Sequence, residues 1–276
     1  MTVSKTTDAN RTHGTIVLRG GRLTKWKGQA ASLSPSLGQL IASVSPVALG
    51  RALMVGASKT ATAAVLGGAG LIVTTSGASA ACTNTSGKVY VCSSDETTTQ
   101  SLSGGASLLD VTIVDPAASF DTSDTAGDAF ELTGDAGITF EDETAGATIT
   151  GATYGINAKN YGTGALSITA TGTTTGSNGT GINGYNKDTG TSLTINAATT
   201  AGGDYGIKAD NNGTGVLSIT ATGTTTGTKY YGIYANNSSA GTSLTINAAT
   251  TTGGVRGIYA TNDGTSLTIN AATTTG

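Results

Sequence analysis

Side chains that can perform acid–base or nucleophilic chemistry are scarce in this sequence. The one histidine is His13, and no histidine follows Ala80. The only thiols are those of Cys82 and Cys92. Histidine-assisted nucleophilic catalysis and the usual zinc sites need histidine or several thiolates in one place. We therefore predict no catalytic residue, no metal ligand and no cofactor in the region after Ala80.

Acidic residues are concentrated in one segment. Ten of the seventeen aspartates and glutamates lie between Asp110 and Glu143. Such a cluster suggests calcium binding, but neither an EF-hand loop nor the nonapeptide calcium repeat is present. After residue 150 the charged residues stand singly, whereas a glycan-cleaving site needs paired carboxylates. We interpret the acidic segment as a solvated face and expect a protein that is not an enzyme.

The two cysteines are predicted to form a disulfide. An even pair of cysteines in an exported chain indicates such a bond. The residues between Cys82 and Cys92 include the turn-forming stretch Asn84–Gly87. The alternative is a lipoprotein acylated at Cys82. Residues 79–81 lack the large aliphatic residue expected before an acylated cysteine, so this alternative ranks behind the disulfide.

A repeat fills the second half of the chain, with a period of about 25 residues, which lies in the range typical of stacked repeat proteins. A Gly-Ile pair recurs at nearly constant intervals, with its isoleucine at Ile156, Ile182, Ile207, Ile233 and Ile258. The units alternate in type, so that every second isoleucine is 51 residues from the last. The period therefore favours a stacked architecture.

Each repeat contains two short runs in which apolar and polar residues alternate, as in Ile156/Ala158 and Leu166/Ile168. Glycine, asparagine and threonine separate the runs, and no proline follows Pro116. One unit cannot fold alone, because each buried large side chain supplies about 1.5–3 kcal/mol while each ordered residue costs roughly 1–2 kcal/mol. Stacking resolves this shortfall, because the buried side chains of successive units then form one continuous core. We predict an all-β, right-handed parallel β-helix (β-solenoid), preceded by a leader or signal helix.

One polar position is as regular as the isoleucines. An asparagine stands four residues after each of them, at Asn160, Asn186, Asn211, Asn237 and Asn262. Stacked coils would place these residues in a column at a corner, where their amides can hydrogen-bond along the stack. The simpler interpretation is a turn preference without a ladder, but an asparagine in all five repeats favours the ladder, which we predict. The residue after each isoleucine varies freely, and we interpret this position as plain solvent-facing surface: Asn157, Asn183, Lys208, Tyr234 and Tyr259.

Residues 1–80 differ in charge from the rest of the chain. They carry a formal charge of +7, and residues 81–276 carry −10. The apolar run 61–73 follows Lys59 and precedes an A-x-A sequence, which predicts a secretory signal cleaved between Ala80 and Ala81. We divide the chain into a basic leader or mis-assigned start (1–53), a signal peptide (54–80), a cap with degenerate coils (81–150) and regular repeats (151–276). The sequence leaves open whether translation starts at Met1 or Met54.

Together, the signal, the close cysteine pair and the GTGALSITATGTTTG…YGIYANN repeats resemble the N-terminal part of a Gram-negative autotransporter, a type V secreted protein with an adhesin-like passenger. The resemblance covers residues 54–276. It implies export by the Sec machinery, handling by the outer-membrane assembly machinery, and a location on the outer-membrane surface or outside the cell. Members of this family end in a membrane β-barrel, and no segment of that kind is present here. We expect the sequence to be a truncated frame or fragment. The nearest string to the GDSG motif of the serine-protease members is 134–137, which has Ala136 in place of the serine.

The leading functional hypothesis is a non-enzymatic surface passenger that mediates adhesion, autoaggregation or biofilm formation. Its ladders of threonine, asparagine and tyrosine would make many weak contacts with surface glycans or with another copy. Nucleic acid is not an expected partner. The first alternative is an ice-binding solenoid, suggested by T-x-T arrays such as Thr169/Thr171/Thr173. A second, weaker alternative is a secreted polysaccharide-active β-helix enzyme using carboxylates between Asp121 and Glu143.

Overall fold

The computed structural model describes residues 2–8, 11–17, 62–65, 71–74, 82–93, 95–115, 117–142 and 146–276. The chain divides into two units, Met1–Ala78 and Ser79–Gly276. The described segments of the first unit form two antiparallel pairs. Strands β1 (Thr2–Asp8) and β2 (Arg11–Val17) make one pair, and β3 (Thr62–Val65) and β4 (Leu71–Thr74) make the other.

The helix predicted for the leader is not what these described segments adopt. Strands β3 and β4 occupy the apolar run where the signal helix was expected. Gly67, Gly68 and Gly70 lie between them, and each glycine costs a helix about 1 kcal/mol relative to alanine. No helix in the described part of the chain is long and apolar enough to cross a membrane.

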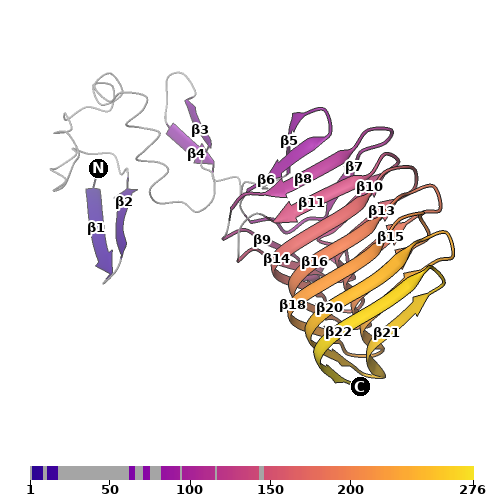
Figure 1. The fold of residues 1–276 in the computed structure, drawn as a ribbon. Coiled ribbons are helices and arrows are strands. Elements are labelled where there is room, and N and C mark those ends of the chain that lie inside the picture. Colours follow the sequence, from indigo (N-terminus) through magenta and orange to yellow (C-terminus); the bar gives the residue numbers. More distant parts are fainter. Residues whose placement is uncertain are drawn as a thin grey trace. The chain divides into compact units, whose positions relative to one another are not determined.

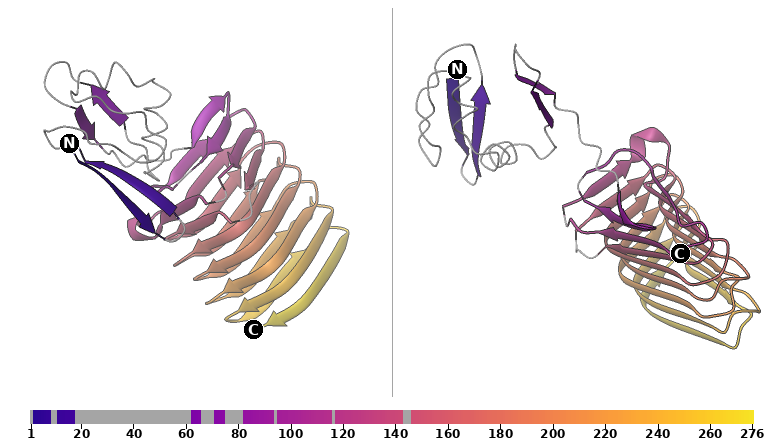
Figure 2. Two further views of the ribbon diagram at one scale, coloured as in Figure 1. Left: turned by 90° about the vertical axis from the view of Figure 1, so that its left-hand side faces the viewer. Right: turned by 90° about the horizontal axis from the view of Figure 1, so that it is seen from above.

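The second unit is a parallel β-solenoid, which confirms the predicted fold class. Its strands lie one above another in the stack that Figures 1 and 2 show. Its first face is a seven-stranded sheet with one strand per coil. These strands are β7 (Gln100–Ser103), β10 (Phe130–Gly134), β13 (Tyr154–Asn160), β15 (Thr180–Asn186), β17 (Tyr205–Asn211), β19 (Tyr231–Asn237) and β21 (Arg256–Asn262).

The other two faces share one larger sheet. In the early coils they are separate strands: β8 (Leu109–Ile113) and β11 (Ile138–Asp142) on the second face, β9 (Ser119–Thr122) and β12 (Thr148–Gly151) on the third. A 3₁₀ turn, Ser123–Thr125, follows β9. In the regular coils one long strand covers both faces: β14 (Leu166–Gly176), β16 (Leu193–Gly202), β18 (Leu217–Gly227), β20 (Ser243–Gly253) and β22 (Ser266–Thr275).

Each of β14, β16 and β18 has a register shift where the chain turns from the second face to the third, for example between Ala170 and Thr173. The two halves of β14 pair separately, the first with β11 and the second with β12. The long strands are therefore the fused form of the separate strands in the early coils.

The N-terminal end of the stack carries an antiparallel hairpin. Strand β5 (Thr83–Ser86) pairs with β6 (Val89–Cys92), and β6 in turn pairs in parallel with β8 of the next coil. The turn contains Gly87 with a φ of 59°, and the Asn84 Nδ2 donates to the Gly87 carbonyl over 2.8 Å. The hairpin covers an edge that would otherwise expose unpaired backbone groups.

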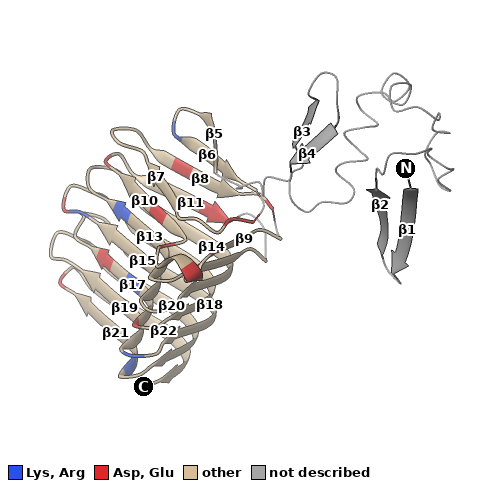
Figure 3. Ribbon diagram, turned by 180° about the vertical axis from the view of Figure 1, so that it is seen from behind, with Lys and Arg blue, Asp and Glu red and all other residues tan. Residues whose placement is uncertain are grey.

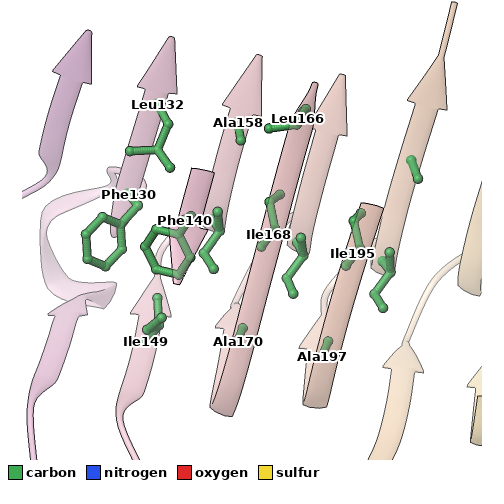
Figure 4. Close-up of a cluster of buried hydrophobic side chains, with 14 of the residues drawn as sticks. Phe130, Leu132, Phe140, Ile149, Ala158, Leu166, Ile168, Ala170, Ile195 and Ala197 are labelled. Carbon is green, nitrogen blue, oxygen red and sulfur yellow. The ribbon is translucent and has the colours of Figure 1, made fainter. Parts of the chain in front are cut away.

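The interior consists of columns of aliphatic residues. The five repeat isoleucines lie in one column, and each pairs with its neighbour in the next coil. Larger rings fill the first coils: Phe120 and Phe130 have centroids 4.7 Å apart, and Phe130 and Phe140 have centroids 5.0 Å apart. Figure 4 shows Phe130, Phe140 and Ile149 meeting in this interior. The core is continuous from Cys82 to Ala248.

Candidate functional site

The outer side of the first face carries most of the distinctive side chains of the repeats. Residues of successive coils lie in register there, so each outward position forms a column along the stack. Eight of the nine tyrosines and every charged residue after Gly151 lie on this face or in its adjoining turns. Figure 3 shows the charged residues along these strands. In the regular coils the other two faces present mainly threonine, serine, asparagine and alanine.

Five tyrosines in the later coils form one cluster, which we call the tyrosine platform: Tyr205, Tyr230, Tyr231, Tyr234 and Tyr259. Tyr205 lies 5.3–5.9 Å from three of the other rings. Tyr231, Tyr234 and Tyr259 stack with interplanar angles of 12–15° and centroids 5.1–6.1 Å apart. All five side chains are half-buried. Rings brought together from three coils give a rigid surface, because four of them stand on strands and Tyr230 directly precedes β19.

Three cations border the platform. Lys208 Nζ lies 5.8 Å from the Tyr234 ring, Lys229 Nζ lies 4.7 Å from Tyr230, and the Arg256 guanidinium lies 5.4 Å from Tyr259. Distances below about 6 Å are those of cation–π attraction. Lys208 also forms an ion pair with Asp210 at 2.8 Å, and Lys229 forms one with Asp204 at 3.6 Å. Arg256 takes part in neither of the two ion pairs found among the described residues.

Two phenols of the platform and the Lys208 side chain beside them have raised pKa values. Burial raises the pKa of Tyr205, and it raises the pKa of Tyr234, where the Asp210 charge adds to the effect. Burial alone would lower the pKa of Lys208, but the hydrogen bond and charge of Asp210 outweigh it, and the pKa is raised. At neutral pH Tyr205 and Tyr234 therefore present phenolic hydroxyl groups, and Lys208 presents an ammonium group.

The position after each isoleucine is not plain surface, which corrects the prediction from the sequence. Asn157 is 4% exposed and Asn183 is 7% exposed. The Asn183 amide donates to Asn157 Oδ1 over 2.9 Å, and the Asn157 amide donates to Asp128 Oδ2 over 2.9 Å. In the later coils the same column holds Lys208, Tyr234 and Tyr259, and there it belongs to the platform. The sequence contained a signal for this column, because aligning the repeats places these five residues at one position.

The five corner asparagines form a continuous ladder. Each side-chain amide donates to the next asparagine, from Asn160 to Asn186, Asn211, Asn237 and Asn262, over 2.8–2.9 Å. The Gly137 N–H donates to the Asn160 side-chain oxygen at one end, and Asn262 donates to the Ser266 carbonyl at the other. The first four of these asparagines are fully buried. Their role is structural, because the interior leaves no route to a ligand.

Cys82 and Cys92 form a disulfide that joins the residue before β5 to the end of β6. The predicted cleavage residues, Ala80 and Ala81, lie outside the described residues. Among the described residues no group of three or more histidine, cysteine, aspartate or glutamate side chains could hold a metal ion. Of the carboxylates between Asp121 and Glu143, Asp142 lies buried under backbone and hydroxyl donors of Thr171 and the N–H of Gly172, and Glu143 is outside the described residues.

The third face presents threonine in register. One outward column contains Thr175, Ala201, Thr226, Thr252 and Thr275.

Comparison with known proteins finds no matching family model, no matching curated protein and no matching solved structure.

Proposed function

We propose that this chain is the passenger region of an exported surface protein that adheres to other surfaces without performing catalysis. The proposal includes export through the Sec and outer-membrane assembly machineries, as in the autotransporters that the repeats resemble. The parallel solenoid and the Cys82–Cys92 disulfide support it, because disulfides persist in oxidising compartments outside the cytoplasm.

The observation that carries the adhesive role is the tyrosine platform. Tyrosine and arginine dominate the energetics of binding surfaces, because large rings with a polar group give much contact area for little lost conformational entropy. The platform places five tyrosines beside Arg256 on an outer face. A surface with this composition has no role in the core and is best explained by a partner outside the chain.

The test uses beads coated with the full chain. We expect the beads to bind epithelial or bacterial cells, or to aggregate with one another, more than albumin-coated beads do. The variant Y234S/Y259S should lose most of this binding, and T194A/T245A on the second face should retain it. Both variants should keep the circular dichroism of the native chain. Equal binding by the two variants would contradict the role of the first face, and no binding by the native chain would contradict adhesion itself.

Ice binding is a second candidate, favoured by the threonine column of the third face. Regular threonines on a flat strand surface also fit a simpler cause, because threonine is a good residue for exposed strands. Measurement of thermal hysteresis decides between ice binding and the ordinary preference for threonine on exposed strands. Hysteresis that disappears in T226Y/T252Y would replace the adhesive proposal, and its absence would remove the ice-binding candidate.

A further inference from the structure

We propose that the tyrosine platform binds an acidic polysaccharide, with a sugar carboxylate on the Arg256 guanidinium and sugar hydroxyl groups on the phenols. This inference rests on the adhesive function proposed above and assigns its ligand class. The occupant follows from three properties of the platform: how its rings are arranged, which of its cations is available, and how charge is distributed along the solenoid.

The ring arrangement favours contact through edges and hydroxyl groups. Tyr231, Tyr234 and Tyr259 stack on one another, so the ring faces are partly covered by neighbouring rings. The edge of an aromatic ring is the positive part of its quadrupole. A neutral phenol adds a hydroxyl donor at that edge. The accessible parts of the platform therefore attract acceptor-rich, electronegative groups more than they attract the apolar face of a neutral sugar.

The cations also favour an acidic sugar over a neutral one. Lys208 and Lys229 are each paired with an aspartate, and these pairs suit hydroxyl groups of a sugar, which can both donate and accept. Arg256 is exposed and in neither ion pair. A guanidinium binds a carboxylate through two parallel hydrogen bonds, a geometry that lysine does not offer. Its contact with the Tyr259 ring holds the guanidinium at the edge of the platform.

Charge along the solenoid directs an anionic chain to this end. Residues 82–150 contain twelve acidic residues and one basic residue, a formal charge of −11. Residues 151–276 contain four acidic and five basic residues, a formal charge of +1. An acidic polymer is repelled by the early coils over about a Debye length, which is roughly 10 Å at 0.1 M salt. The platform lies in the later coils, where the formal charge is slightly positive and this repulsion is absent.

The experiment compares three soluble polymers on the immobilised full chain at low and moderate salt: polygalacturonate, its fully methyl-esterified form, and dextran. The ester has the same backbone without the charge. We expect polygalacturonate to bind, with affinity that falls as salt rises, and the two neutral polymers to bind at least tenfold more weakly. R256Q should weaken polygalacturonate binding about fivefold or more. The matched control K159Q removes a cation from the same face outside the platform and should change it less than about twofold.

The outcomes separate this inference from the proposed function. Equal binding of the acid and its ester would overturn the acidic ligand in favour of a neutral glycan. No binding of any polymer, with bead adhesion intact, would overturn the inference and leave the adhesive function standing. Concentration-dependent dimers that R256Q abolishes, without polymer binding, would assign the platform to a second copy of the chain. If R256Q and K159Q lose the same affinity for polygalacturonate, the effect of R256Q is one of net charge alone. That result would overturn the proposed site at Arg256.

Discussion

Threonine occupies a buried column that larger apolar residues fill in the earlier coils. Phe120 and Ile149 pair in succession down this column, and Thr174, Thr200 and Thr225 continue it. The Oγ1 atoms of these three threonines are buried and have no hydrogen-bond partner. A buried hydroxyl group without a partner costs about 1–3 kcal/mol. Three successive regular coils therefore each keep a destabilising group, whereas in the next coil the Thr251 hydroxyl donates to the Thr273 carbonyl.

Replacing Thr225 by valine should stabilise the protein. Valine has nearly the same shape and removes the unpaired hydroxyl, so we expect a gain of about 1 kcal/mol in the free energy of unfolding. Urea denaturation followed by circular dichroism measures it. The control T226V changes an outward threonine of the same strand and should stay within about 0.5 kcal/mol of the native chain. A less stable T225V would mean that the hydroxyl is satisfied in the folded protein.

Replacing Asn211 by alanine should destabilise the protein strongly. Asn211 accepts from Asn186 and donates to Asn237, so its removal leaves a donor and an acceptor buried without partners. With about 1–3 kcal/mol for each, we expect a loss of roughly 2–5 kcal/mol. The control is N270A, which removes one exposed rung, the bond from Asn270 to Asn247. If both variants unfold at the same urea concentration, the buried ladder contributes no more than a surface contact.

Two aspartates should shift the pH dependence of stability in opposite directions. Burial raises the pKa of Asp128 more than its hydrogen bonds from Asn157 and Tyr154 lower it. Hydrogen bonds from Ser123 lower the pKa of Asp121. A raised pKa in the folded protein favours the protonated form of Asp128. The stabilisation that Asp128 contributes is therefore fully present below its unfolded-state pKa and is lost as the pH rises through its folded-state pKa. A lowered native pKa gives Asp121 a contribution that is present above its unfolded pKa and is lost as pH falls through the native one.

Melting temperatures between pH 7 and pH 3 test these signs. Relative to the native chain, D128N should lose more stability between pH 7 and pH 3, because it lacks a carboxyl group whose protonation stabilises the folded protein. D121N should lose less, because it lacks a group that is weakened by protonation. Identical pH profiles for the two variants would show that neither environment perturbs its carboxylate.

At the scale of the element, a column of glycines sets where each coil turns from the third face to the first. Gly151, Gly176, Gly202 and Gly227 end successive strands of the third face. A Cβ at Gly227 would overlap the carbonyl of Tyr231, and a Cβ at Gly202 would overlap that of Tyr205. The backbone approach itself excludes a side chain, which explains why each of these strands ends in glycine.

Gly227→Ala should therefore destabilise the solenoid by about 2 kcal/mol or more, since the obstacle is backbone that cannot move aside. Gly184 is the matched control. A Cβ there would meet only the side-chain tips of Leu193 and Ile195, at 3.2 and 3.3 Å, and alanine holds the same column position in β13 and β17. Gly184→Ala should be neutral or stabilising by about 0.5 kcal/mol, because alanine restricts the unfolded chain. Thermal melts of both variants check the contrast, and equal losses would refute it.

At the scale of the whole molecule, stability comes from contact between neighbouring coils. Leu244 and Ile246 of β20 are buried, whereas their counterparts in β22, Leu267 and Ile269, are 47% and 44% exposed. The sequences around them are the same, so it is the next coil that buries them. Solenoid stability is accordingly a sum of repeat and interface terms.

Deleting residues 182–232 should leave a folded solenoid. The deletion removes 51 residues, one full pair of alternating coils, and joins Gly181 to Ile233 so that the Gly-Ile pair and its asparagine four residues on are restored. We expect β-sheet circular dichroism and one cooperative melt. Deleting residues 182–194, about half a coil, puts second-face residues on the first face and should abolish cooperative melting. Unfolding of the longer deletion variant would contradict nearest-neighbour stacking.

The features of this protein that depend on period and alternation could be predicted from the amino-acid sequence. The Gly-Ile spacing predicted the length of each coil and a solenoid, and the regularly spaced asparagines predicted the position of the corner ladder. These follow from one repeat, because stacking copies every position into a column. The turn-forming stretch noted between Cys82 and Cys92 lies in the hairpin that the disulfide closes.

The tertiary structure alone decided what neighbouring coils do to each other's side chains. The variability of the position after each isoleucine led to the prediction that Asn157 and Asn183 face solvent, but the coils beside them bury both and connect them to Asp128. The tyrosine platform arises because residues one repeat apart meet across stacked strands, and its ring distances depend on side-chain directions that no single repeat specifies. Period fixes where a column runs. Contact between columns decides which of its members are buried, paired or free to bind.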